Sequence, residues 1–311
     1  MKMECIHRYL SITNGHKLPN GRQIPVLGIG SWDSCGQDAY NSMIMAIEHG
    51  VRLVDTASSY KNEAGIGKAI REKIAEGVLK REDMYVITKL WNTDHRPDLV
   101  QKAFKESLEN LGVDYIDLYL MHNPYAFREG DELFPRDSNN EIIPSDVDFV
   151  DTWREMERLF ASGLAKNIGI SNFNELQIVR LLKLCDYPPS VIELECHPLL
   201  TNVDLSEFCK RNNILFIAYS PLGSPNRPIQ FTGEPKLLDN NTVKIIGMKY
   251  NKSPAQILIR YQLQRGHIPI PKSETLEFIR ENVDVFNFEI SPEDMSRINS
   301  MNIHRRFVNS L

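Results

Sequence analysis

Residues 54–70 read VDTASSYKNEAGIGKAI, a sequence in which an apolar strand ends, a polar loop follows and a helical pattern begins. Asp55 stands where a buried parallel strand would reach the edge of its sheet, and Tyr60 follows before the helical spacing starts. Taken alone, Asp55 would be explained as the cap of a turn and Tyr60 as a half-buried aromatic residue. Together they predict an acid and a phenol on one rim of a sheet.

The same order of strand and helix recurs along the chain. Segments with helical apolar spacing, such as Leu176, Val179 and Leu182, separate eight short apolar runs: 26–30, 52–55, 84–89, 116–122, 165–172, 191–196, 214–220 and 268–273. Near-continuous apolar strands that alternate with amphipathic helices indicate a parallel sheet covered by helices. Such a sheet is either open and doubly wound or closed into a barrel.

The strand count and one glycine motif favour the barrel. Eight strands suit closure, whereas Gly28-Ile29-Gly30 lacks the third glycine of a dinucleotide-binding Gly-x-Gly-x-x-Gly motif. We therefore predict an α/β fold, a (β/α)8 TIM barrel, formed by residues 1–311 as a single domain. A hairpin over residues 8–25, with an Asn14-Gly15 type I′ turn, would close its bottom. Long loops at 123–148 and 222–238 would lie over the C-terminal face.

Composition and charge restrict the partners. With 42% hydrophobic residues, a formal net charge of -5 and no basic run, neither nucleic acid nor an anionic membrane is an expected partner. The apolar runs are far shorter than the roughly 20 residues that span a bilayer, and the first ten residues do not form a signal peptide. We expect a cytoplasmic monomer that acts on a small molecule. We also expect no metal site, with free thiols at Cys5, Cys35, Cys185, Cys196 and Cys209.

In a barrel of parallel strands, reactive residues come from the C-terminal ends of several strands. An acid, a phenol, an amine and an imidazole meet there. In chain order the strand ends carry Trp32, Asp55 with Tyr60, Lys89 with Trp91, His122, Ser171 with Asn172, 193–197, Tyr219 with Ser220, and Lys272 with Ser273.

This set of side chains suits the reduction of a carbonyl group. A phenol has a pKa of about 10, but a neighbouring ammonium such as Lys89 would lower it, and Asp55 is the available partner for that ammonium. His122 would orient an acceptor oxygen beside Tyr60. The set donates a proton but no hydride, so a nicotinamide cofactor is required, with Tyr219 as a face for its ring. The alternative is a structural Asp–Lys pair with an unrelated core tyrosine and core histidine.

Several motifs of the chain match those of one known family. They are Asp55-Thr56-Ala57 with Tyr60 and Glu63, Thr88-Lys89-Leu90-Trp91, Asp117-Leu118-Tyr119-Leu120-Met121-His122, Gly169-Ile170-Ser171-Asn172-Phe173, Glu195-Cys196-His197-Pro198, Tyr219-Ser220-Pro221-Leu222-Gly223-Ser224 and Ile270-Pro271-Lys272-Ser273. With them the sequence resembles the aldo-keto reductases, most closely the aldose and aldehyde reductase branch, over nearly its whole length. The resemblance implies a (β/α)8 barrel that uses NADPH. It also implies that Tyr60 is the proton donor, that Lys89 and Asp55 tune it, and that His122 orients the carbonyl.

The resemblance also implies cofactor contacts. Ser171 and Asn172 would hold the nicotinamide carboxamide, and Tyr219 would stack on the ring. The remaining contacts would be Ser220, Leu222 and Ser224 along the cofactor tunnel, Lys272 and Ser273 at the adenosine 2′-phosphate, and Glu281 and Asn282 at the adenine. Ser171-Asn172 would also suit the N-cap of a helix that begins near Glu175.

The chain departs from the family pattern at the carboxamide and in the substrate pocket. Glu193 stands where the family usually has a glutamine that binds the carboxamide, and a carboxylate accepts hydrogen bonds but cannot donate them. In the substrate pocket Trp32 and Trp91 are kept, while Asn123 replaces a tryptophan. We expect a smaller and more polar wall there.

Two further departures concern the rest of the cofactor. Asp33 and Asn226 replace the lysine and the acid that latch the cofactor in relatives. Phe278 replaces an arginine expected at the 2′-phosphate, and Arg280 lies on another face of its helix. The expected cofactor is therefore NADP(H), with relaxed discrimination against NAD(H).

The resulting hypothesis is an NADPH-dependent reductase of aldehydes, with sugars, lipid aldehydes and ketones as candidate substrates. The alternative is a catalytically weak barrel that binds a cofactor or has a structural role. The complete set of Asp55, Tyr60, Lys89 and His122 argues against that alternative.

Overall fold

Eight parallel strands form the centre of the protein in a computed structural model that describes residues 11–308. Strands that are neighbours in this sheet are consecutive in the chain. They are β3 (Ile29–Gly30), β4 (Leu53–Asp55), β5 (Tyr85–Leu90), β6 (Leu118–Met121), β7 (Ile168–Ser171), β8 (Val191–Glu195), β9 (Leu215–Tyr219) and β10 (Ile268–Pro269). Each of the eight predicted apolar runs therefore overlaps a strand.

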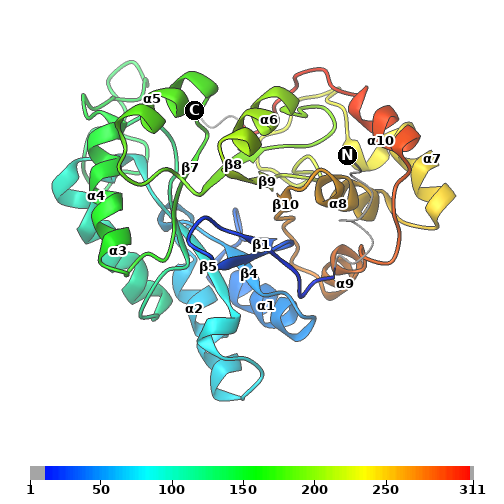
Figure 1. Cartoon of the computed structure of the whole chain (residues 1–311), viewed down its shortest axis with the longest axis horizontal. Helices are drawn as coiled ribbons and strands as arrows, with labels where there is room; N and C mark the ends of the chain where they lie inside the picture. The colour runs from blue at the N-terminus through cyan, green and yellow to red at the C-terminus, as the bar shows by residue number, and fades with distance from the viewer. Residues whose placement is uncertain (1–10, 309–311) are drawn as a thin grey trace.

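Helices separate the strands along the chain. They are α1 (Gly36–Glu48), α2 (Glu63–Ala75), α3 (Pro97–Leu111), α4 (Phe149–Ala161), α5 (Glu175–Leu184), α6 (Val203–Arg211), α7 (Asn241–Tyr250), α8 (Pro254–Gln264), α9 (Leu276–Val283) and α10 (Pro292–Asn299). Helices α1 to α6 follow one another around the strands in chain order, while α10 lies beside α7 (Figure 1). Short 3-10 helices are η2 (Ser58–Tyr60), η3 (Arg81–Asp83), η4 (Asn92–Asp94) and η5 (Leu237–Asp239).

Hydrogen bonds join the two ends of the sheet. The amide of Gly28 donates to the carbonyl of Pro269 at 3.1 Å. The amide of Gly30 donates to the carbonyl of Pro271 at 3.2 Å. Gly30 also forms a parallel bridge with Lys272. The first strand thus contacts the last, which is consistent with a (β/α)8 fold and not with an open doubly wound sheet.

An antiparallel hairpin, β1 (Gly15–Lys17) and β2 (Gln23–Pro25), precedes the sheet. The prediction that Asn14-Gly15 forms its turn is wrong, because Gly15 already lies in β1 and pairs with Pro25. The turn covers 18–22, where proline fixes φ at position 19 and Gly21 has a φ of 84° that glycine adopts readily. The part of the predicted hairpin at 8–10 lies outside the described residues.

An apolar cluster fills the space inside the strands. Leu53 and Val191, the first residues of β4 and β8, belong to it, together with Leu18 and Ile24 of the hairpin. The hairpin therefore lies at the N-terminal ends of the strands, opposite the rim on which the candidate site was predicted.

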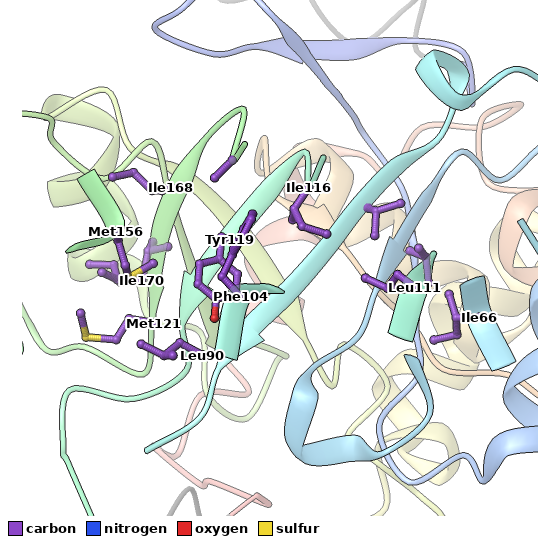
Figure 2. Packing of buried hydrophobic residues seen from close by; sticks show 14 of the residues in the cluster. Ile66, Leu90, Phe104, Leu111, Ile116, Tyr119, Met121, Met156, Ile168 and Ile170 are labelled. Atoms are coloured by element: carbon purple, nitrogen blue, oxygen red, sulfur yellow. The ribbon is translucent and has the colours of Figure 1, made fainter. Parts of the chain in front are cut away.

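A second apolar cluster fills the space between strands and helices. Figure 2 shows Phe104 of α3 beside Tyr119 of β6, and their ring centroids are 4.9 Å apart. Ile168 and Ile170 of β7 belong to the same cluster. On α5 the predicted core position Leu176 is 81% exposed, because the helix turns Ile178 and Leu181 inward instead.

Four of the five cysteines lie within the described residues, and none of these four forms a disulfide. Cys5 lies outside that range. No group of histidine, cysteine and acidic side chains in residues 11–308 is arranged to hold a metal ion. Among the helices of this range, none has the length and apolar character needed to cross a membrane.

Candidate active site

Strand geometry brings the predicted site residues to one end of the strands. Side chains two residues apart on a strand face the same side, so each polar residue lies above an apolar residue of the inner cluster. The pairs are Leu53 and Asp55, Ile87 and Lys89, Leu120 and His122, Val191 and Glu193, and Ile217 and Tyr219.

Lys89 lies at the centre of this group. Its Nζ is 2.6 Å from both Oδ1 and Oδ2 of Asp55, donates to the carbonyl of Thr56 at 3.0 Å, and is 3.3 Å from Oε1 of Glu193. The Lys89 side chain is 0% exposed. Burial lowers the pKa of Lys89, but the charges of Asp55 and Glu193 raise it more, so the net shift is upward. Lys89 therefore stays charged at neutral pH.

Tyr60 ends η2, which begins three residues after Asp55. Ser58 ties this turn to β5 by donating its hydroxyl to the carbonyl of Lys89 at 3.0 Å, and the Lys89 Nζ is 5.2 Å from the centre of the Tyr60 ring. Burial raises the pKa of Tyr60, whereas the Lys89 ammonium lowers it. The net shift is upward, so the prediction of a lowered pKa is wrong: Lys89 acts as expected, but burial outweighs it. Tyr60 is therefore held in its proton-bearing form.

His122 follows β6 and lies between Tyr60 and Trp91. Its ring meets theirs edge to face, with centroid distances of 5.7 Å and 5.0 Å. Burial, followed by the positive charge of Lys89, lowers the pKa of His122 well below its ordinary value. Its buried Nδ1 has no hydrogen-bond partner among the described residues. A neutral imidazole carries one N–H, which can donate to an acceptor oxygen beside Tyr60.

Glu193 is a buried residue of β8. It is the second acid beside Lys89 of β5, after Asp55 of β4. Burial, followed by the charge of Asp55, raises its pKa well above the ordinary value, against the opposing effect of Lys89. The acid form of this side chain would carry an O–H group that can donate a hydrogen bond, whereas the carboxylate only accepts.

Ser171, Asn172 and Tyr219 form a connected polar group beside Glu193. The Tyr219 hydroxyl donates to Oδ1 of Asn172 at 2.9 Å, Asn172 Nδ2 donates to the carbonyl of His122 at 3.0 Å, and the Ser171 hydroxyl donates to the carbonyl of Glu193 at 3.0 Å. These bonds link the ends of β6 to β9. The N-cap of α5 is Asn174, so the alternative explanation of Ser171-Asn172 as a helix cap is wrong.

The loop at 222–238 begins beside this group. The hydroxyls of Ser220 and Ser224 share a hydrogen bond at 2.6 Å, and both residues have left-handed backbone angles. Leu222 is partly buried and packs against two clusters of buried apolar residues. Glu234 pairs with both Arg227 and Arg305, so the loop is held to the C-terminal segment. Asn226 is exposed, and the carbonyl of Asp33 accepts a hydrogen bond from Lys272 Nζ at 2.7 Å.

The residues predicted at the adenosine end lie near one another. Ser273 and Asn282 border the same small cavity, while the carbonyl of Glu281 accepts a hydrogen bond from Gln256 at 3.3 Å. Glu281 itself is half-buried.

The charged groups at this end are largely engaged with one another. The Lys272 Nζ is 3.0 Å from Oε1 of Glu274, which also accepts from the hydroxyl of Ser34 at 2.7 Å. Phe278 is 55% exposed, and Arg280 donates to Nε2 of His49 at 2.9 Å, away from Lys272. The pairing of Glu274 with Lys272 was not predicted from the sequence.

The predicted substrate pocket is bordered by residues that the sequence reading did not single out. Trp91 is buried, donates Nε1 to the carbonyl of Leu133 at 2.8 Å, and meets Phe134 edge to face at 5.3 Å. Asn123 is buried and donates Nδ2 to Asn92 Oδ1 at 3.1 Å. Trp32 is 37% exposed on the loop after β3. Phe134 lies in the long loop at 123–148, and an aromatic side chain in a loop expected over the site was the sequence signal that could have identified it.

Residues 26–303 match the sequence pattern of the Aldo/keto reductase family. The chain belongs to this family. Aldo-keto reductase family 1 member A1-A of Danio rerio is 44% identical over 292 residues, which cover 94% of this chain and 90% of the relative. Estradiol 17 beta-dehydrogenase 5 of Mus musculus is 42% identical over 299 residues, with 94% and 92% covered.

A solved structure of this aldo/keto reductase family has a closely similar fold. The aldose reductase of Schistosoma japonicum superposes with a TM-score of 0.88 at 41% sequence identity, covering 94% of this chain and 93% of that one. Membership in the family supports an oxidoreductase that acts on aldehydes or ketones, with a nicotinamide cofactor.

Proposed function

We propose that this aldo/keto reductase reduces aldehydes to alcohols with NADPH, in a closed (β/α)8 barrel, with Tyr60 as the proton donor. The observation that carries the proposal is the contact of Lys89 with Asp55, with the Lys89 Nζ 5.2 Å from the centre of the Tyr60 ring and the His122 ring 5.7 Å from that of Tyr60. Ketones, sugars and lipid aldehydes are further candidate substrates. The name of the mouse relative, a steroid dehydrogenase, adds a steroid ketone to the set worth assaying.

The roles of the four side chains follow from their charge states. Tyr60 keeps its proton until a carbonyl oxygen beside it gains negative charge, and the Lys89 ammonium then stabilises the phenolate that remains. Asp55 holds Lys89 in place and balances its charge. The neutral His122 donates its N–H to the carbonyl oxygen and so orients it. The carbonyl carbon receives a hydride and its oxygen receives the Tyr60 proton, which gives the alcohol.

The residues present fit a nicotinamide, whose chemistry when bound is to supply that hydride. A carboxamide needs both acceptors and donors, and Ser171, Asn172 and a protonated Glu193 offer both. Oε2 of Glu193 is a buried polar atom for which the described residues provide no partner. Tyr219, whose hydroxyl is fixed by Asn172, offers an aromatic face.

The remaining cofactor contacts that we propose are those of the sequence reading. Ser220, Leu222 and Ser224 would follow the tunnel, Ser273 and Lys272 would meet the 2′-phosphate, and the adenine would lie at Glu281 and Asn282. Because Lys272 already pairs with Glu274, the fit to a 2′-phosphate is weaker than the fit to the nicotinamide. We propose a cytoplasmic monomer, as the family resemblance implies.

The test is the oxidation of NADPH by the purified protein over a panel of small aldehydes, ketones, sugars and a steroid ketone, measured as the loss of nicotinamide absorbance. The proposal expects turnover with at least one aldehyde. A protein that binds NADPH but turns over no carbonyl compound would support the alternative of a cofactor-binding barrel, which the complete catalytic set disfavours.

A further inference from the structure

Glu193 and Glu195 are two buried glutamates on the same face of β8, but their hydrogen bonding differs. Glu195 is surrounded by donors: Oε1 accepts from the amide of Phe307 at 2.6 Å, Oε2 accepts from the amide of Val308 at 3.1 Å, and His197 Nε2 is 2.9 Å away. Oε2 of Glu193 has no partner within residues 11–308. A buried carboxylate oxygen without a donor is costly, and a proton on the group removes that cost.

Glu193 also shares its single cation with another acid. Lys89 Nζ is 2.6 Å from Oδ2 of Asp55 and 3.3 Å from Oε1 of Glu193, and all three side chains are at most 4% exposed. Two carboxylates close to one ammonium leave one uncompensated negative charge in a buried site. Such pairs commonly hold one proton between them.

Within the described part of the chain, Lys89 supplies the positive charge that acts on Glu193. Burial raises the pKa of both tyrosines that face it and lowers the pKa of the histidine, so these three are neutral near pH 7. They are Tyr60 from η2, His122 after β6 and Tyr219 from β9. From the neighbouring β7 the facing group is the Ser171 hydroxyl, which does not titrate.

We propose that Glu193 is a positioning residue that carries a proton in the active enzyme, and that loss of this proton to solvent switches off proton donation by Tyr60. The proposal rests on the proposed function, because it assumes that Tyr60 is the donor. The raised pKa of Glu193, caused first by burial and then by the charge of Asp55, supports it.

The switch follows from charge balance around Lys89. While Glu193 is neutral, the ammonium offsets Asp55 and can stabilise the phenolate that Tyr60 becomes, and the Glu193 O–H is a donor that an amide carbonyl can use. After deprotonation, a second anion beside Lys89 opposes formation of the phenolate, and the side chain can only accept. The chain therefore gains a pH-sensitive group that a glutamine at this position would not provide.

The first test compares the pH dependence of kcat/KM for wild type and Glu193→Gln. Glutamine has the same shape and is permanently neutral, so the variant should keep activity at the acid end. Above the pKa of Glu193, kcat/KM of wild type should fall roughly tenfold per pH unit, while that of the variant should not.

A matched control is Glu157→Gln, and a reserve variant is Glu193→Met. Glu157 is a buried glutamate of α4 whose Oε1 accepts the amides of Asp186 and Tyr187, and an amide oxygen can do the same. Its pH profile should match wild type. If Glu193→Gln does not fold, Glu193→Met removes the ionisable group with a side chain of similar length.

The second test uses the cofactor-free protein and does not depend on activity. The folded state holds a proton that the unfolded chain has released above the ordinary glutamate pKa, so wild-type stability should fall as the pH rises toward the higher folded value. Glu193→Gln lacks this loss. The difference in Tm between variant and wild type should therefore grow with pH, by roughly 2–4 °C per pH unit in that window.

The two readouts separate the possible failures. If the Tm difference grows with pH but no carbonyl compound is reduced, the proposed function is wrong, while the conclusion that folded Glu193 carries a proton is supported. If both proteins are active and their pH profiles coincide, the switch is refuted. If the Tm difference is independent of pH, Glu193 is ionised in the fold and the proposal is overturned.

Discussion

The Lys89 ammonium lies 2.6 Å from both carboxylate oxygens of Asp55, and both side chains are buried. Removing either member leaves the other uncompensated. Lys89→Met should therefore reduce turnover by roughly 10²-fold or more, because the phenolate formed at Tyr60 loses its cation and Asp55 is left unpaired. Steady-state kinetics from acid to alkaline pH measures this. Lys102→Met, which removes an exposed lysine, is the control; a Lys89→Met profile that matches wild type would refute the role of Lys89.

We propose that Asn123 forms part of the wall of the substrate pocket, at a position where the family pattern has an indole, so inhibitors with a carboxylate that stack on aromatic walls should bind weakly. Asn123→Trp should tighten them by roughly two- to tenfold, the range expected for one added aromatic contact. Inhibition constants for wild type, Asn123→Trp and Asn123→Ala measure this. If the tryptophan variant binds such inhibitors no better than the alanine variant, the pocket wall is not where we place it.

Glu274 forms an ion pair with Lys272, the cation expected to meet a 2′-phosphate, and Phe278 supplies no charge there. Phe278→Arg and Glu274→Ala should each raise the preference for NADPH over NADH. A charged hydrogen bond is worth about 1.5 to 3 kcal/mol, which corresponds to roughly ten- to a hundredfold for the arginine variant. Dissociation constants of both cofactors, measured by quenching of protein fluorescence, test this directly. Glu277→Ala removes an exposed charge from the same helix and should change nothing; equal preference in all four proteins would contradict the assignment.

The close approach of α2 to α3 depends on Gly67. A Cβ atom at this position would lie 2.0 Å from the carbonyl oxygen of Leu111, so Gly67→Ala forces the two helices apart. We expect a loss of about 1–3 kcal/mol in the free energy of unfolding, the usual cost of overpacking. Gly36→Ala is the matched control, since a Cβ there meets nothing within 4 Å. Denaturant unfolding of both variants decides between this account and a looser helix contact.

The sequence predicted the order of the strands and the rim on which the polar residues meet, because both depend on local periodicity. The period of two that places Ile87 inward also places Lys89 inward. The hairpin turn was misplaced because Asn14-Gly15 and Asn20-Gly21 carry the same local signal, and only the pairing of Gly15 with Pro25 distinguishes them.

The charge states of the site were not predictable from the sequence in the same way. The direction of the pKa shift of Tyr60 depends on how burial compares with the effect of Lys89, and only the packed site determines that comparison. Likewise, the upward shift of the Glu193 pKa depends on burial and on two carboxylates that meet at one ammonium from different strands. The pairing of Lys272 with Glu274, and of Arg280 with His49, depends equally on side-chain directions.

The most direct test of the account is the turnover of Tyr60→Phe with a small aldehyde and saturating NADPH, alongside the dissociation constant of NADPH. The substitution removes only the phenolic oxygen, so the ring contact with His122 at 5.7 Å should remain. We predict a fall in kcat of roughly 10²-fold or more with cofactor affinity unchanged, since the proton donor is lost and the cofactor contacts are not. A kcat close to that of wild type would contradict the claim that Tyr60 donates the proton.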